Sequence, residues 1–310
     1  MKILFIGFGS IARKHFLAFS SLDQNIIFYA LRSSKIFEEI EGVVSLSSWQ
    51  NVPADIAFAI ISNPTSLHLE ALADCVERDI PVMIEKPVAE SIVGLEEIIT
   101  KIRERSIPNY VACNLRFLPV LQFLKDRIAG GELSVNEVNV YCGSDLRKWR
   151  PGKEYKNSYS ANESQGGGVH LDLFHELDYL VWIFGIPMSW KGVRRSVSSL
   201  EISAADYAHY NLFYENFSAT MTLNYYRRDA KRQIEILFDD ETWTVNLLKG
   251  TVTTSGNNII FDSGSSGINE TYETQAKHVL EMLSGNVESI NPIFQSIEIL
   301  KICLSGEKIS

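Results

Sequence analysis

The stretch GGGVHLDLFHELDYL (residues 166–180) places two histidines and three acidic side chains directly after three glycines. On a helix, the three-residue spacing of Asp172, His175 and Asp178 puts these side chains along one flank, about 60° apart. A histidine near pH 7 can take or give a proton, and a neighbouring carboxylate can bind hydroxyl groups or orient the imidazole. The pattern predicts acid–base chemistry at Asp172 and His175, with a polar helix start as the alternative.

The same stretch is a poor metal site. His175 and Glu176 are not part of an HExxH motif, and His170 and Asp172 would face apart on a helix. The chain has four widely spaced cysteines without a CxxC pair, which favours reduced thiols over a zinc site or disulfides. We therefore expect no metal.

A second candidate for chemistry lies near the N-terminus, where GFGSIA (residues 7–12) follows an apolar run. This G-x-G-x-x-A spacing suits a pyrophosphate, because the glycines allow a tight turn and a close approach of backbone amides. The following helix would offer its unpaired N–H groups to the anion. The predicted dinucleotide contacts are Gly7, Phe8, Gly9, Ser10, Ile11 and Ala12.

The choice between NAD and NADP is expected at the end of the second strand. An NAD site there carries an acid that accepts from the ribose 2′-OH, yet the sequence YALRSSK has no acid before Glu38. Arg32, Ser33 and Lys35 instead offer positive charge and donors suited to a 2′-phosphate. We predict NADP, with NAD possible, since these residues could also form only a solvated helix start.

Alternating strands and helices must position the first site. Continuous apolar runs bounded by turn residues predict buried strands near residues 3–6, 25–31, 54–62, 80–85 and 110–114. Helical patterns lie between them, at 63–79 and 89–105. This alternation predicts a Rossmann-type, doubly wound parallel sheet, an α/β domain over residues 1–115.

The sequence pattern changes after residue 115. Segments with period-two alternation and tight turns predict an open, mainly antiparallel sheet, flanked by helices near 170–184, 271–284 and 293–305. We expect residues 116–310 to form one α+β domain. Its segment YAHYNLFYENFSATMTLNYY would expose aromatic rings if the sheet were uncovered, which predicts a homodimer or homotetramer paired through that sheet.

Composition excludes several classes of protein. A chain of 310 residues with 45% apolar and 22% charged residues is typical of ordinary globular proteins. Its net charge of -9 argues against a nucleic-acid surface. No apolar run approaches the roughly 20 residues of a membrane span, and the first apolar run is too short for a signal peptide. We expect a cytoplasmic protein without a membrane partner.

Further motifs carry a family resemblance. EKP ends the fifth strand at residues 85–87, NPTSLH occupies 63–68 and CNLRFLP occupies 113–119. Together with the glycine-led stretch at 166–180, and in this order, they make the chain resemble the Gfo/Idh/MocA oxidoreductases. The resemblance implies an NAD(P)-binding domain and a second domain whose open sheet binds substrate and pairs subunits.

The resemblance also implies roles for single residues. Lys86 matches the lysine that hydrogen-bonds the reacting hydroxyl or carbonyl, and Asp172 and His175 match the motif after the glycines. A cationic Lys86 can stabilise an incipient alkoxide. Further cofactor contacts are expected from residues in the three motifs: Asn63, Pro64, His68, Glu85, Lys86 and Arg116.

The chain departs from the founding members in one spacing. They separate Asp and His by four positions with a glycine between, whereas here the separation is three, with Leu173 and Phe174. A branch of the family shares DLxHELDYL, so His175 is kept as the acid–base candidate. His170 stands where that branch has an aliphatic residue, and it is either an extra substrate contact or a filled polar niche.

The segment at residues 144–168 is rich in Arg, Lys and Tyr and precedes the candidate catalytic helix. Aromatic faces suit sugar rings, and Arg and Lys suit phosphate or carboxylate, so this segment is either a substrate lid or an exposed loop. The branch with similar stretches is associated with bacterial surface sugars. The predicted substrate contacts are Trp149, Arg150, Tyr155, Tyr159 and His170.

The sequence thus predicts an NAD(P)-dependent dehydrogenase or reductase. Its substrate would be a secondary alcohol or ketone of a sugar, cyclitol or nucleotide-linked sugar. Two alternatives remain: a non-catalytic sensor that binds the dinucleotide and a sugar, and a hydrolase or lyase that uses transient oxidation by tightly held NAD.

Overall fold

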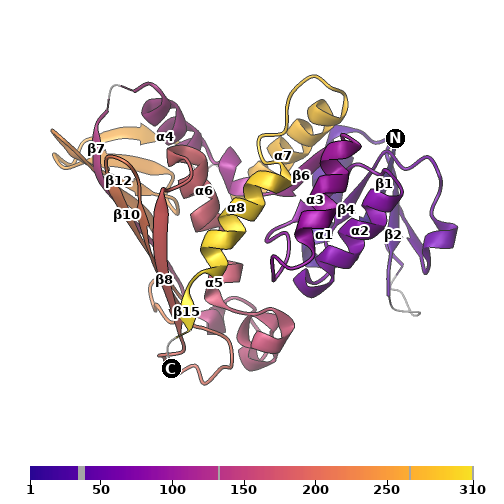
Figure 1. The fold of residues 1–310 in the computed structure, drawn as a ribbon, viewed down its shortest axis with the longest axis horizontal. Helices are drawn as coiled ribbons and strands as arrows, with labels where there is room; N and C mark the ends of the chain where they lie inside the picture. The colour runs from indigo at the N-terminus through magenta and orange to yellow at the C-terminus, as the bar shows by residue number, and fades with distance from the viewer. Residues whose placement is uncertain (34–38, 132, 265–266, 309–310) are drawn as a thin grey trace. The chain divides into compact units, whose positions relative to one another are not determined.

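The computed structural model describes residues 1–33, 39–131, 133–264 and 267–308 (Figure 1). The chain divides into two compact units: Met1–Asn114 with Gly267–Ile297, and Leu115–Ser266 with Glu298–Ser310. Within the described ranges, no helix combines the length and the apolar character that crossing a bilayer requires. Each unit has its own sheet.

The first unit contains a six-stranded, fully parallel sheet in the order β3-β2-β1-β4-β5-β6. Its central strand is fully buried from Ile3 to Phe5, as the apolar run at 3–6 predicts. The strand order reverses between β1 and β4, and ligands of such sheets bind at that point. The strands are β1 (Lys2–Ile6), β2 (Ile27–Leu31), β3 (Val43–Leu46), β4 (Phe58–Ile61), β5 (Val82–Glu85) and β6 (Asn109–Ala112).

Helices flank this sheet and leave its carboxyl edge to loops (Figure 1). The α-helices preceding residue 115 are α1 (Ser10–Leu22), α2 (His68–Glu77) and α3 (Leu95–Glu104). Short 3-10 turns η1 (Trp49–Asn51) and η2 (Thr65–Leu67) lie in the connections.

Helix α7 (Ile268–Leu283) changes the predicted domain division. We expected residues 116–310 to form the second domain, whereas residues 267–297 belong to the first unit. The buried face of α7 explains this, because Thr271 accepts from Asn114 at 2.7 Å and Gln275 accepts from Tyr110 at 3.4 Å. An amphipathic pattern predicts a helix but does not say which sheet the helix covers.

The second unit contains a nine-stranded mixed sheet in the order β14-β13-β12-β11-β7-β10-β9-β8-β15. Most neighbours are antiparallel, while β7–β10 and β8–β15 are parallel. The predicted fold class is therefore confirmed in both halves. The strands are β7 (Val135–Gly143), β8 (Ser189–Arg195), β9 (Tyr207–Phe213), β10 (Ser218–Asn224), β11 (Lys231–Phe238), β12 (Thr242–Asn246), β13 (Thr251–Thr254), β14 (Ile259–Asp262) and β15 (Glu307–Lys308).

Helices of the second unit line one face of this sheet (Figure 1). They are α4 (Pro119–Ala129), α5 (Val169–Asp172) and α6 (Phe174–Phe184), while α8 (Ile293–Leu304) begins in the first unit and ends in the second. The 3-10 turns are η3 (Asn114–Phe117), η4 (Leu146–Lys148), η5 (Tyr155–Asn157), η6 (Tyr159–Ala161) and η7 (Glu163–Gln165).

The other face of the sheet is more polar than the sequence suggested. Tyr210 and Tyr225, two of the aromatic residues expected there, are fully buried. The alternate positions instead form polar pairs, with His209 Nδ1 3.0 Å from Thr222 Oγ1. Tyr207 and Phe213 lie on the same face of β9 as His209 and are at least partly exposed, so pairing through this sheet stays a prediction.

Candidate active site

The turn after β1 requires glycine at its first position. Gly7 has φ 81°, and a Cβ added there would lie 2.7 Å from the Asn63 Cα. The Gly7 amide donates to the Leu31 carbonyl at 2.9 Å, and the Ser62 hydroxyl donates to the Gly7 carbonyl at 3.0 Å. The turn is thus fixed to both strands beside β1, at the point where the strand order reverses.

Space for a side chain is available at Gly9, whereas at Gly7 neighbouring atoms fill it. A Cβ at Gly9 would meet nothing within 4 Å, so packing inside the protein does not demand a glycine there. Gly9 is also the N-cap of α1, has no side chain to cap the helix, and leaves the first-turn amides to a ligand. An exposed glycine before an uncapped helix N-terminus fits a dinucleotide pyrophosphate.

The other residues of this motif divide between the core and the surface. Phe8 is 9% exposed and packs edge-on against Phe5 at 5.0 Å, so only its backbone is available to a cofactor. Ala12 is fully buried. Ser10 is exposed and Ile11 half-buried at the helix start.

The end of β2 carries the predicted cofactor-selecting residues. Arg32 is half-buried, with its amide bonded to the Leu46 carbonyl at 3.0 Å, and Ser33 is exposed. Lys35 and Glu38 lie outside the described residues.

The EKP segment is tied to the first helix. His15 of α1 is fully buried, and its Nε2 lies 2.6 Å from Glu85 Oε1. The second carboxylate oxygen of Glu85 accepts from the Lys86 amide at 3.2 Å. Both oxygens of Glu85 are therefore engaged within the unit, and they fix the backbone that carries Lys86.

His68 joins the two loops that follow β4 and β5. Its Nε2 lies 3.0 Å from the Asn63 carbonyl and its Nδ1 2.9 Å from the Pro87 carbonyl, with the ring 1% exposed. Burial lowers the pKa of His68, which favours a neutral ring that donates to one carbonyl. We predicted that His68 binds the cofactor; the structure shows a ring occupied in positioning Asn63 and Pro87.

Arg116 is likewise not exposed to a ligand. Its guanidinium is fully buried and makes a two-pronged pair with Asp178, at 2.9 Å from Nε and 2.8 Å from Nη2. Breaking such a pair is strongly destabilising, because it leaves a buried charge unpaired. We predicted that Arg116 contacts the cofactor; the structure shows its side chain engaged with Asp178, a pair that holds η3 to α6.

The candidate catalytic residues lie at a break between two helices. Helix α5 ends at Asp172 and α6 begins at Phe174, with Leu173 at φ −94° and ψ 32° between them. Asp172 and His175 are both half-buried, and only these two of the predicted trio remain accessible. The flank predicted for one continuous helix is therefore divided.

One phenol holds the Asp172 carboxylate, and a second lies near it. The Tyr225 hydroxyl donates to Asp172 Oδ2 at 2.5 Å. Burial together with Asp172 raises the pKa of Tyr159 to about 12, and the same causes raise that of Tyr225. Both phenols thus stay protonated, and that of Tyr225 donates to Asp172. Sequence reasoning missed Tyr225, because its strand pattern does not distinguish a core tyrosine from one that ends at a site.

Two of the predicted substrate contacts, Trp149 and Arg150, lie beside these phenols. Arg150 lies over the Tyr159 ring at 4.8 Å, and Trp149 packs edge-on against Tyr225 at 5.3 Å. The Tyr155 hydroxyl instead donates to the Leu200 carbonyl at 3.1 Å, which anchors the segment. The segment is thus packed onto the candidate site.

His170 is held inside the second unit. Its Nε2 lies 3.0 Å from Arg194 Nη1, and the residue is 6% exposed. Since Arg can only donate, Nε2 accepts. Burial and the neighbouring Arg194 lower the pKa of His170 to about 3, so the ring is neutral near pH 7. These contacts favour the polar-niche interpretation.

Metal binding finds no support in the arrangement of side chains. Across the described ranges, no three His, Cys, Asp or Glu residues converge in a way that could hold an ion. Glu176, next to His175, is fully buried and pairs with Arg232 at 2.6 Å.

A glycine turn at the switch point of a parallel sheet, joined to a mixed-sheet unit, is the architecture of a two-part dinucleotide-binding protein. Residues 1–112 match the oxidoreductase family with an NAD-binding Rossmann fold, and residues 125–282 match that family's C-terminal α/β domain. The chain belongs to the Gfo/Idh/MocA oxidoreductase family.

Relatives within the family are distant. The chain is 24% identical to 4-carboxy-2-hydroxymuconate-6-semialdehyde dehydrogenase of a Sphingobium species, over 59% of this chain and 58% of that protein. It is 28% identical to scyllo-inositol 2-dehydrogenase (NADP(+)) IolW of Bacillus subtilis, over 60% of this chain and 50% of that protein. The matches therefore span less than two thirds of either relative.

Solved structures share the fold over nearly the whole chain. Levoglucosan dehydrogenase in complex with NADH aligns with a TM-score of 0.84 at 16% identity, covering 98% of this chain and 95% of that one. The WlbA dehydrogenase from Bordetella pertussis, in complex with NADH and UDP-GlcNAcA, aligns with a TM-score of 0.82 at 17% identity, covering 98% and 94%.

Proposed function

We propose that this protein is an NAD(P)-dependent dehydrogenase or reductase that acts on a secondary alcohol or ketone of a sugar-like substrate. The observation that carries the proposal is the Asp172 carboxylate, held by the protonated Tyr225 phenol three positions before a half-buried His175. A partly accessible imidazole beside a held carboxylate is suited to proton transfer near pH 7.

Each unit has its own part in the proposed reaction. The first unit would hold the dinucleotide at the Gly7 and Gly9 turn, and the bound nicotinamide supplies the hydride acceptor or donor. Lys86, fixed through Glu85, would hydrogen-bond the reacting oxygen and stabilise developing negative charge on it. His175 would carry the proton, and Asp172 would orient substrate hydroxyls or the imidazole.

The substrate class is proposed from the segment at residues 144–168, the candidate substrate lid. Trp149, Arg150 and Tyr159 present aromatic and cationic surface beside Asp172, and this combination suits a sugar ring that bears an acidic or phosphorylated group. Structural neighbours are named for sugar substrates, among them levoglucosan dehydrogenase and a UDP-N-acetylglucosamine 3-dehydrogenase. We propose a sugar, cyclitol or nucleotide-linked sugar.

NADP is the proposed cofactor, with NAD as the alternative. Arg32 and Ser33 follow β2, and the sequence from there has no acid before Glu38, which suits a 2′-phosphate. IolW is named for NADP(+), whereas the neighbours with a bound cofactor hold NADH. A homo-oligomer and a cytoplasmic location stay predictions.

Net nicotinamide absorbance change with a panel of sugars and nucleotide sugars tests the proposal. We expect a substrate-dependent change that His175→Ala abolishes. Binding of dinucleotide and sugar without turnover would instead identify a sensor. Product formation without net cofactor change, with cofactor retained through purification, would identify the hydrolase or lyase alternative.

A further inference from the structure

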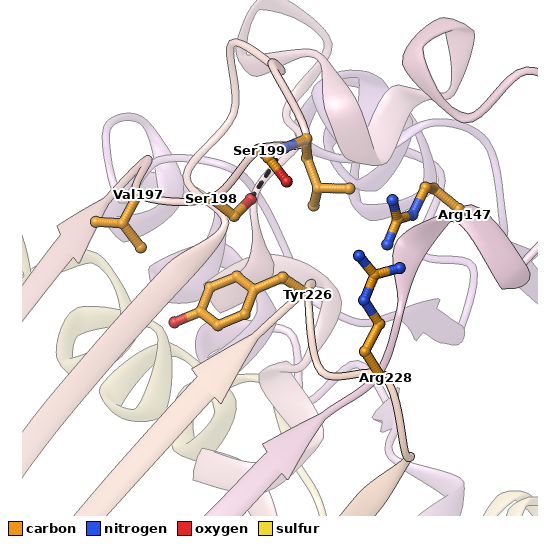
Figure 2. A pocket seen from close by; sticks show the side chains of 7 residues that line it. Arg147, Val197, Ser198, Ser199, Tyr226 and Arg228 are labelled. Atoms are coloured by element: carbon orange, nitrogen blue, oxygen red, sulfur yellow. Dashed lines mark hydrogen bonds between the residues drawn. The ribbon is translucent and has the colours of Figure 1, made fainter.

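A cavity of about 350 Å³ opens in the second unit, lined by side chains that the proposed reaction does not use. It lies where η4, the end of β10 and the connection between β8 and β9 meet (Figure 2). The lining residues are Arg147, Val197, Ser198, Ser199, Leu200, Tyr226 and Arg228.

Two guanidinium groups lie at one side of this cavity and share a single carboxylate. Arg147 pairs with Asp145 in a two-pronged contact, with Nε and Nη2 each 2.8 Å from a carboxylate oxygen. Arg228 reaches the same carboxylate through Nη1 at a longer 3.3 Å. Asp145 is only 3% exposed and lies beneath the two arginines. Two positive charges therefore face the cavity against one buried negative charge.

The two arginines are bound to Asp145 to different extents. The bidentate contact engages two donors of Arg147, whose side chain is 34% exposed. Arg228 is 70% exposed and makes one long contact with Asp145, so most of its five donors point to solvent or to a ligand. Figure 2 shows both guanidinium groups directed into the space beside Ser199 and Tyr226. Arg228 is thus free to move onto a bound anion while Arg147 stays fixed.

The remaining walls offer donors and an aromatic surface. Burial raises the pKa of Tyr226, so its phenol stays protonated near pH 7. Ser199 is exposed at the rim, and Ser198 is held by its bond to Asp206. Two adjacent guanidinium groups can donate to several oxygens of one anion, as a phosphate group offers.

We propose that this cavity is a binding site for the phosphate group of a small metabolite, with Arg228 as the mobile clamp and Arg147 as the fixed one. The volume exceeds that of one phosphate, so the ligand would carry an organic part against Tyr226. The inference does not rest on the proposed reaction, since none of these residues is assigned a role in it.

Calorimetric titration with inorganic phosphate and with ribose 5-phosphate, at constant ionic strength, tests the site. The protein is first saturated with NADPH, because phosphate could otherwise bind at the helix N-terminus after Gly9. We expect the sugar phosphate to bind more tightly than inorganic phosphate, and Arg228→Gln to weaken both by about tenfold or more, the usual effect of losing a charge-assisted hydrogen bond.

Arg227→Gln is the matched control. Arg227 is the neighbouring arginine, pairs with Asp229 at 2.7 Å, and does not line the cavity. The control removes the same charge and should leave phosphate affinity unchanged. Circular dichroism and thermal unfolding establish that both variants are folded.

Three results would overturn the proposal. The first is phosphate binding that is equal in wild type and Arg228→Gln. The second is equal weakening by the two variants, which would indicate only long-range attraction. The third is absence of phosphate binding together with an oligomeric state that Arg228→Gln changes in light scattering, which would assign the arginines to contacts with carboxylates of a second copy.

Discussion

The two candidate sites of this protein differ in what shapes them, backbone conformation at one and side-chain hydrogen bonds at the other. At the dinucleotide turn, Gly7 and Gly9 shape the site through backbone conformation and missing side chains. At Asp172, a side chain from a distant part of the chain, Tyr225, holds the carboxylate through its hydroxyl group. The first site depends on residues adjacent in sequence, and the second on residues brought together by the fold. Substitutions should therefore affect the two sites in different ways.

The largest effect is expected at His175. If its imidazole carries the proton, His175→Ala lowers turnover by about 10²–10⁴-fold, the usual contribution of general acid–base catalysis. Dinucleotide affinity should stay the same, because the turn that binds it belongs to the other unit. Steady-state kinetics and cofactor titration measure the two quantities. Near-wild-type turnover of His175→Ala would indicate that Lys86 or another group carries the proton.

The next effect tests whether side chains from elsewhere in the sheet build the Asp172 site. Tyr225→Phe removes one donor to this carboxylate and should lower kcat/KM by roughly 10- to 100-fold, as expected for a hydrogen bond to a charged group. Tyr210→Phe is the control, because its equally buried hydroxyl donates to the Cys303 carbonyl at 2.7 Å. Equal loss of activity in both variants would indicate a general packing defect.

A smaller effect separates the two glycines. Gly9→Ala should weaken dinucleotide binding by about tenfold and leave thermal stability unchanged, since the new methyl meets only the space for the ligand. Gly7→Ala should instead destabilise the fold by more than about 1 kcal/mol, because alanine must adopt positive φ and contact Asn63. Unchanged cofactor affinity in Gly9→Ala would show that the turn after β1 does not bind the cofactor.

The smallest effect concerns cofactor selection. Arg32→Ala should weaken NADPH binding severalfold and NADH binding hardly at all, because an exposed charge pair contributes little. Calorimetry of the two cofactors measures the ratio. Equal or tighter binding of NADH to the wild-type protein would contradict the proposed preference for NADP.

The contrast between the sites also explains what the sequence could predict. The parallel sheet and the glycine turn follow from local patterns, namely buried apolar runs and the spacing of Gly7, Gly9 and Ala12. The pattern at Asp172 and His175 was visible, but Tyr225 lies 53 positions from Asp172 and no periodicity connects them.

The surroundings of other predicted residues show the same limit. Arg116 and His68 lie in motifs that resemble cofactor-binding segments, yet pairing with Asp178 and burial between two carbonyls occupy their side chains. Similarly, α7 has an ordinary amphipathic pattern, and its tertiary contacts assign it to the first unit, among them the packing on α1 and the hydrogen bonds of Thr271 and Gln275. In each case, contacts between residues far apart in the sequence determine where the side chain or helix lies.

The break at Leu173 frees the spacing between Asp172 and His175 from the geometry of a single helix. On one continuous helix, each inserted residue would turn His175 by about 100° relative to Asp172. Because α5 ends at Asp172 and α6 begins at Phe174, an insertion or deletion at this joint would change the length of a connection instead. We expect the joint to give this part of the chain a tolerance to single-residue length changes that a continuous catalytic helix would lack.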